Sequence, residues 1–131
     1  MSDSRNDSVV EIISGKSFNA TLVRVLESIR EKGMTVFAQI DHAAGARAIG
    51  SAMLPTTVVI YGNPFGGTPL MLAAPQAALD LPLRVLVREG DGGQVVVSFH
   101  PIAPLLRQAG VPETLSTRLD AAQHMLVEVL S

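Results

Sequence analysis

The spacing of hydrophobic residues along the chain predicts two main helices. The first begins after Ser17, a suitable N-cap, and ends at Gly33, with apolar residues at helical spacing: Phe18, Leu22, Val25, Leu26 and Ile29. The second follows Pro112, and its apolar stripe consists of Leu115, Leu119, Ala122, Leu126 and Val129. One face of each helix is therefore expected to pack on a core.

Alternating or β-branched runs predict five strands. They cover residues 9–13, 35–40, 56–61, 83–89 and 94–99, and the last two form a hairpin around Gly90-Asp91-Gly92-Gly93. The resulting order β-α-β-β-β-β-α predicts an α+β domain, in which an antiparallel sheet of about five strands carries two main helices on one face.

Short helices are expected in the connections. Asp41 is a suitable cap for a helix that runs through Ile49. After the turn Gly62-Asn63-Pro64, Thr68 is the expected N-cap and Pro69 the first residue of a helix that ends at Ala74. Residues 76–80 and 102–109 are expected to add a turn and a short helix.

Length and composition limit the functional classes. The 131 residues suit one compact domain, which we expect at 8–131 after a frayed arm at 1–7. The chain has no cysteine and begins with a polar segment, so it is expected in the cytoplasm. A net charge of -2, few aromatic residues and no basic stripe predict no nucleic-acid partner and no membrane partner.

Residues 48–79 contain no charged side chain. Prolines and glycines interrupt this charge-free run, so it is not a membrane-spanning helix. We expect its faces to be covered by the core, by a second subunit or by a ligand, and we therefore look for function there. The alternative is a central strand and a buried connection without any site.

Two groups of residues in and beside this run are candidates for chemistry. Gly66-Gly67-Thr68-Pro69 would let N–H groups at a helix N-terminus hold an anion, or would only form a turn and a cap. His42, with Asp41 before it and Arg47 after it, could transfer a proton or bind an anion, or could be only a satisfied imidazole beside a cap.

Other patterns predict less. Ser14-Gly15-Lys16-Ser17 matches the end of a phosphate-binding loop, but the glycine-bearing loop is missing, so a helix cap is the better interpretation. His42, His100 and His124 do not have the spacing of metal ligands, and no metal site is predicted. No cofactor is indicated.

The central block resembles the domain of unknown function 302 family of bacteria and archaea. The resemblance rests on AQIDHAA at 38–44, PTTVVIYGNP at 55–64, GTPLM at 67–71 and LDLPLRVLV at 79–87. It implies a fold of the TATA-binding-protein-like class and a small, often homodimeric domain, and it brings no established activity. The family-motif positions are His42, Asn63, Pro64, Gly67, Thr68 and Met71.

The leading hypothesis is a homodimeric small-ligand binding or sensory module. In it, Asp41-His42 and the loop from Asn63 to Thr68 meet in a cleft at one end of the sheet. Thr68 and nearby N–H groups, including that of Gly67, would bind an anionic or carbonyl group, and Asn63 would orient it. His42 would supply a hydrogen bond or a proton, and Met71 and Tyr61 would form an apolar wall.

Two other hypotheses remain open. In the first, the chain is an enzyme that uses His42 as a general acid or base with help from Asp41 or Glu89. In the second, the chain is a structural or interaction domain, and the charge-free run is a subunit interface without any small ligand.

Overall fold

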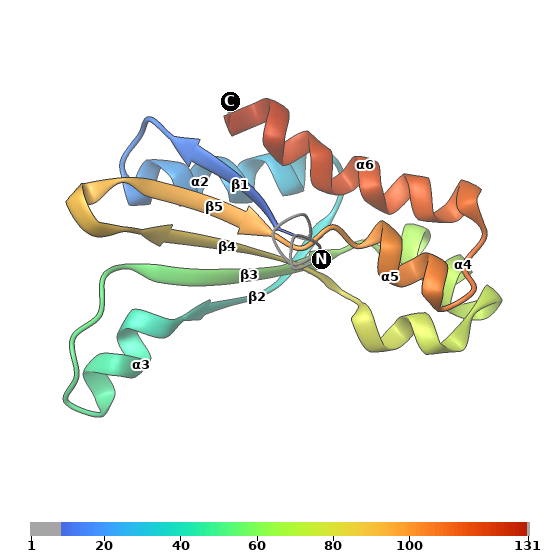
Figure 1. The fold of residues 1–131 in the computed structure, drawn as a ribbon, viewed down its shortest axis with the longest axis horizontal. Helices are drawn as coiled ribbons and strands as arrows, with labels where there is room; N and C mark the ends of the chain where they lie inside the picture. The colour runs from blue at the N-terminus through green and yellow to red at the C-terminus, as the bar shows by residue number, and fades with distance from the viewer. Residues whose placement is uncertain (1–8, 131) are drawn as a thin grey trace, which may run out of the picture.

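The computed structural model describes residues 9–130, where five strands form one antiparallel sheet in the order β1-β5-β4-β3-β2 (Figure 1). The predicted arm at 1–7 lies outside the described residues. The strands agree closely with the hydrophobic pattern: β1 (Val10–Ser14), β2 (Thr35–Asp41), β3 (Thr56–Gly62), β4 (Leu83–Glu89) and β5 (Val95–Phe99). Every predicted strand is present, and β4 and β5 pair as a hairpin.

The two long helices, α2 (Phe18–Glu31) and α6 (Glu113–Leu130), cover one face of the sheet (Figure 1). Alternate strand residues point toward them, so that Val59, Val85 and Val97 are fully buried together with Ile29 and Leu126 of the helices. The predicted α+β architecture, with an antiparallel sheet and two main helices on one face, is confirmed.

Side-chain caps fix the beginning of α2. The Ser17 hydroxyl accepts a hydrogen bond from the Ala20 N–H at 3.1 Å, and Gly33 adopts a positive φ just after the helix. The hydroxyls of Ser14 and Thr21 lie 2.6 Å apart and join the end of β1 to the helix. The segment at 14–17 is therefore a helix cap, as the sequence indicated.

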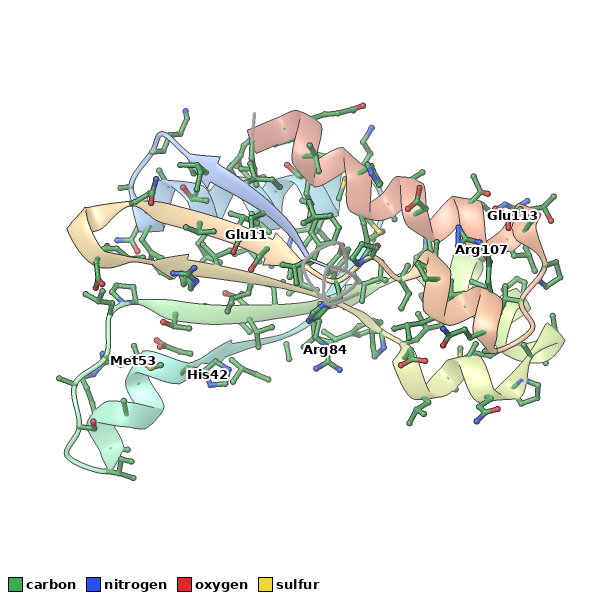
Figure 2. The ribbon with its side chains drawn as sticks, in the orientation of Figure 1. Glu11, His42, Met53, Arg84, Arg107 and Glu113 are labelled. Carbon is green, nitrogen blue, oxygen red and sulfur yellow. The ribbon has the colours of Figure 1, made fainter. Side chains whose placement is uncertain are left out.

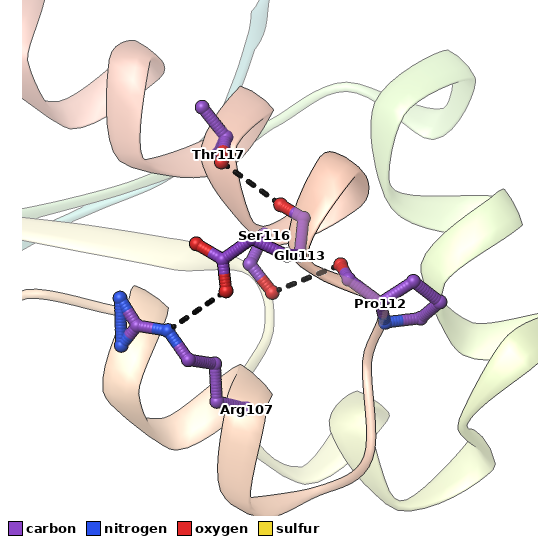
Figure 3. Close-up of polar contacts among 5 residues, drawn as sticks. All are labelled: Arg107, Pro112, Glu113, Ser116 and Thr117. Atoms are coloured by element: carbon purple, nitrogen blue, oxygen red, sulfur yellow. Dashed lines mark hydrogen bonds and ion pairs between the residues drawn. The ribbon is translucent and has the colours of Figure 1, made fainter.

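The junction between α5 (Ala103–Gln108) and α6 is held by polar contacts (Figure 3). Arg107 Nε donates to Glu113 Oε1 at 3.2 Å, and the hydroxyls of Ser116 and Thr117 donate to the carbonyl oxygens four residues before them. These contacts close the first turn of α6 after Pro112. Buried Gln123, further along α6, donates to the His100 carbonyl and accepts from the Ile102 N–H.

The charge-free run is covered only in part. Its central strand, β3, buries every second side chain, but more than half of the run is exposed. The exposed part comprises the end of α3 (His42–Ala48) with the loop after it, most of α4 (Pro64–Ala73) and most of the 3-10 helix η1 (Pro75–Asp80). Of the three kinds of cover expected for the run, the chain's own core is excluded for the two segments that flank β3, and cover by a second subunit or a ligand stays a prediction there.

Candidate functional site

Helix α4 begins directly after β3. Asn63 is its N-cap: Oδ1 accepts from the Phe65 N–H at 3.0 Å, and the carbonyl accepts from Gly66 and Gly67 at 2.9 and 2.8 Å. Pro64 occupies the first helical position, where the missing N–H has no consequence. The prediction that this helix begins at Thr68 is wrong, because the earlier Asn63-Pro64 pair starts it.

This earlier start changes what the glycines can do. The N–H groups of Gly66 and Gly67 are used within the first turn of α4, and Thr68 lies inside the helix. An anion cradle built from free N–H groups at the predicted N-terminus therefore does not form.

A pocket of about 360 Å³ lies between α4, α6 and the strand ends next to them. Asn63, Gly67, Thr68 and Met71 line it, so the structure brings together four of the predicted site residues. Among the described residues that line the pocket, none is charged, and Asn63 and Thr68 carry the polar side chains. The apolar side chains that line it include Met34, Phe37, Met71, Leu83 and Leu119.

Two of the lining residues carry side-chain donors without a partner in the described chain. Because Asn63 Oδ1 caps the helix, the Asn63 Nδ2 group is left as a donor, and it has no hydrogen-bond partner within residues 9–130. The Thr68 hydroxyl likewise has no partner in that part of the chain. An unpaired ionised group would lose its hydration in such surroundings, so the pocket suits a neutral molecule with a hydrogen-bond acceptor.

Tyr61 belongs to the core and does not line the pocket. Its side chain is fully buried, opposite Leu83 on the neighbouring strand, and its hydroxyl has no hydrogen-bond partner within the described chain. Burial raises the pKa of the Tyr61 phenol well above its ordinary value. Of the two residues expected to form an apolar wall, only Met71 lines the pocket.

His42 lies at the other end of the sheet. In the antiparallel pair β2–β3, Thr35 is opposite Gly62 and Asp41 is opposite Thr57. Asn63 is six positions after Thr57, a distance of about 20 Å along the strand. Figure 2 shows His42 at the beginning of α3, at the opposite end of the sheet from α4. The predicted cleft between Asp41-His42 and the Asn63–Thr68 loop is therefore wrong.

The surroundings of His42 do not form an acid–base pair. Asp41 is the N-cap of α3, and its Oδ1 accepts from the Ala44 N–H at 2.9 Å. His42 is exposed, and between residues 9 and 130 no hydrogen bond or ion pair joins it to Asp41 or Glu89. The arrangement that the enzyme hypothesis requires is not assembled.

Residues 9–130 include no group of three or more His, Cys, Asp or Glu side chains that could hold a metal ion. None of the helices described there is both long enough and apolar enough to cross a membrane.

Residues 10–131 match the family described as domain of unknown function DUF302. The chain belongs to this family. The resemblance seen in the sequence is thereby confirmed over nearly the whole length of the chain, including the pocket residues of α4.

This DUF302 domain is also similar to longer proteins. It is 38% identical over 100 residues to a protein of Brucella suis named fluoride-specific ion channel FluC 1, a match that covers 76% of this chain and 39% of the relative. The Brucella abortus protein of the same name matches with the same identity over 37% of its length. The chain thus spans about two fifths of the curated relatives that it matches.

The fold of the DUF302 domain has a close counterpart among solved structures. The crystal structure of an uncharacterized conserved DUF302 protein from Bacillus stearothermophilus superposes with a TM-score of 0.84 and 14% sequence identity. The match covers 95% of this chain and 98% of the other. At this identity the likeness concerns the fold alone.

Sequence reasoning missed several pocket residues of the DUF302 domain. Met34 and Phe37 reach the pocket because the beginning of β2 pairs with the end of β3, and Phe37 Cε2 lies 3.3 Å from where a Cβ on Gly62 would stand. Leu119 comes from α6, where it was assigned only to the core-facing stripe. The predicted antiparallel pairing already places the beginning of β2 next to the end of β3, so it could have indicated that Met34 and Phe37 lie near Asn63. No local pattern indicates that Leu119 lines the pocket.

Proposed function

We propose that this DUF302 domain binds a small, neutral, largely apolar molecule that carries a carbonyl or similar acceptor. The observation that carries the proposal is the apolar pocket with the Asn63 amide and the Thr68 hydroxyl as its unpartnered donors. Its volume of about 360 Å³ falls in the usual range of small-molecule sites. A carbonyl oxygen has two lone pairs and can accept from both donors.

The apolar lining of the pocket can adapt to ligands of different shapes. Met34 and Met71 have flexible thioether side chains, which adapt to irregular molecules, and Phe37 adds a half-exposed aromatic ring from β2. Gly67 keeps part of the volume open: a Cβ there would lie 3.8 Å from the Met71 terminal methyl, in ordinary contact. A larger side chain at this position would therefore enter the pocket.

A pair of neighbouring glycines allows a matched experiment. Gly67 lines the pocket, whereas Gly66 does not and would bring a Cβ into open space. We expect Gly67→Leu to abolish saturable binding of acetophenone, a neutral aromatic ketone, in an NMR titration. Gly66→Leu should bind it like the unchanged chain. Equal binding by both variants, or no saturable binding by the unchanged chain, would contradict the proposal.

The outer face of α4 and η1 supports a homodimer. Phe65, Leu72 and Leu79 are 89%, 80% and 78% exposed, in a segment without charged residues. Phe65 and Leu72 are seven residues apart and thus share a helix face. A second copy related by a two-fold axis presents the same apolar surface and needs no complementary charge, so we propose self-association through it.

Light scattering during dilution tests this association. The unchanged chain should have the mass of two copies, and Leu72→Glu should have the mass of one. Val23→Glu, at an exposed position on α2, is the control and should remain dimeric. A single-copy mass for the unchanged chain at high concentration, or a dimeric Leu72→Glu, would exclude this interface.

The lack of cysteine supports placing the dimer in the cytoplasm.

The similarity to proteins named fluoride-specific ion channels supports a second candidate function. In it, the domain works beside such a channel and responds to fluoride. Titration of the purified chain with sodium fluoride should then produce saturable amide shifts that sodium chloride does not produce. Identical, non-saturating shifts with both salts would remove this candidate.

A further inference from the structure

We propose a second binding site, for a small organic monoanion such as a short-chain carboxylate, at the end of the sheet opposite the Asn63 pocket. A cavity of about 280 Å³ lies there between the first turn of α2, helix α3 and the beginning of β3. It shares no lining residue with the Asn63 pocket. The proposal therefore stands independently of the function proposed above.

The first turn of α2 brings two backbone donors to this cavity. Phe18 and Asn19 line it and occupy the first two positions of a 14-residue helix. The Ser17 side chain takes the Ala20 N–H, so the N–H groups of Phe18 and Asn19 have no acceptor among the residues that the structure describes. Such N–H groups, at the positive end of the helix dipole, favour a negative charge.

A buried threonine side chain supplies the second, independent observation. Thr57 lines the cavity from β3 and is 5% exposed. Its hydroxyl has no hydrogen-bond partner in the described part of the chain. The hydroxyl is not one of the fully enclosed, unpaired atoms, so it keeps an accessible surface and can donate to a ligand oxygen in the cavity.

The charged residues of the cavity limit the class of ligand. Arg47 lines it from the last turn of α3, and within residues 9–130 its guanidinium forms no ion pair. Asp41 also lines the cavity, although its Oδ1 is engaged by the Ala44 N–H. One cation beside one carboxylate suits a monoanion better than a dianion, because a second negative charge would be repelled by Asp41.

The remaining wall indicates an organic ligand. Phe18, Met53 and Pro55 line the cavity with apolar surface, and Figure 2 shows Met53 beside α3, in the same region as His42. A carboxylate with a short branched chain would place its charge at Arg47 and the α2 amides and its methyl groups against this wall.

The experiment titrates the full chain with isovalerate and, as the neutral analogue, with 3-methylbutan-1-ol. Isovalerate should shift the Phe18, Asn19 and Thr57 amides to saturation, and the alcohol should bind at least about tenfold more weakly, since it lacks the charge-assisted contacts. Equal binding of the two would overturn the proposal. Saturation of these amides by sodium fluoride or phosphate, without saturation by isovalerate, would overturn it as well.

Two variants with a matched control complete the test. Arg47→Gln should weaken isovalerate binding about tenfold, whereas Arg118→Gln, the same change at an exposed position of α6, should leave the affinity unchanged. Thr57→Val should weaken isovalerate several-fold without lowering the melting temperature, because the hydroxyl has no partner to lose. Unchanged affinity in both variants would contradict the site. Gly67→Leu, which fills the other pocket, should not affect isovalerate.

Discussion

His42 and Asn63 lie at opposite ends of the β2–β3 pair. Asp41, the residue before His42, is opposite Thr57, and Gly62, the residue before Asn63, is opposite Thr35. Each strand thus ends in a helix N-cap, and the two helices leave the sheet in opposite directions (Figure 1). The Asn63 pocket and the cavity beside α3 therefore lie at different ends and share no lining residue, so the two ligands proposed above would not contact each other.

The first prediction separates the two ends. Asn63→Asp keeps an oxygen that can cap α4 but replaces the amide donor with a negative charge. We expect acetophenone affinity to fall at least about tenfold with little loss of stability. His42→Ala, at the other end, should bind acetophenone like the unchanged chain. Weaker binding after His42→Ala, by NMR titration, would show that the two ends are coupled.

The second prediction concerns Tyr61. Its buried hydroxyl lacks a partner within residues 9–130, so Tyr61→Phe removes an unsatisfied polar group and leaves the packing intact. We expect the free energy of unfolding at neutral pH to rise by about 1 kcal/mol, measured by urea denaturation. A loss of more than about 1 kcal/mol would mean that the hydroxyl has a partner after all.

The third prediction is an alkaline loss of stability that depends on Tyr61. The phenol of the unfolded chain ionises near its ordinary pKa of about 10, whereas burial holds the folded phenol neutral to a higher pH. Below pH 10 both states are neutral and stability is unaffected. Above it, unfolding should become easier by up to about 1.4 kcal/mol per pH unit.

Two controls make this pH dependence specific. Tyr61 is the sole tyrosine and the chain has no tryptophan, so tyrosinate absorbance reports on this side chain alone. The tyrosinate absorbance should appear at the same pH at which the chain unfolds. In Tyr61→Phe, the free energy of unfolding should fall less steeply above about pH 10. A tyrosinate signal near pH 10 in the folded protein would contradict the burial.

The fourth prediction tests the link between α6 and the end of β5. Gln123 accepts from the Ile102 N–H at 2.9 Å and donates to the His100 carbonyl at 3.0 Å, in a buried position. Gln123→Leu leaves the Ile102 N–H unsatisfied, and we expect a loss of about 2 kcal/mol or more in urea denaturation. Gln123→Glu retains the acceptor, but it buries a carboxyl group and loses the donor to the His100 carbonyl, so we expect it to lose stability as well. An unchanged stability in Gln123→Leu would show that water replaces the side chain.

Most of the fold could be predicted from local patterns. Helix caps such as Ser17 and Asp41, the glycine at 33 and the β-branched run of β3 each act over a few residues, and the structure contains each as expected. Helix α4 was the exception, because Asn63-Pro64 and Thr68-Pro69 both look like a cap followed by a first residue. The two glycines between them suggest a turn or an anion-binding loop ahead of the helix, although a helix tolerates glycine at a cost of about 1 kcal/mol each.

The site was predictable only in part. Asn63, Gly67, Thr68 and Met71 are close in sequence on one helix, so local reasoning could group them. Joining His42 to them required two strand ends to meet, and the antiparallel order that the sequence already predicted places those ends apart. Leu119 reaches the pocket only through the packing of α6 against α4, which no local pattern encodes.

The most direct measurement uses the methionine methyl groups of the protein as reporters. Five methionines are present; Met34 and Met71 line the Asn63 pocket, Met53 lines the second cavity and Met125 lies in the core. In a chain labelled at these methyls, saturating acetophenone should shift Met34 and Met71 and give intermolecular contacts to both, while Met53 and Met125 stay unchanged. Contacts at Met53 instead, or no methyl that responds, would contradict a neutral-ligand site beside Asn63.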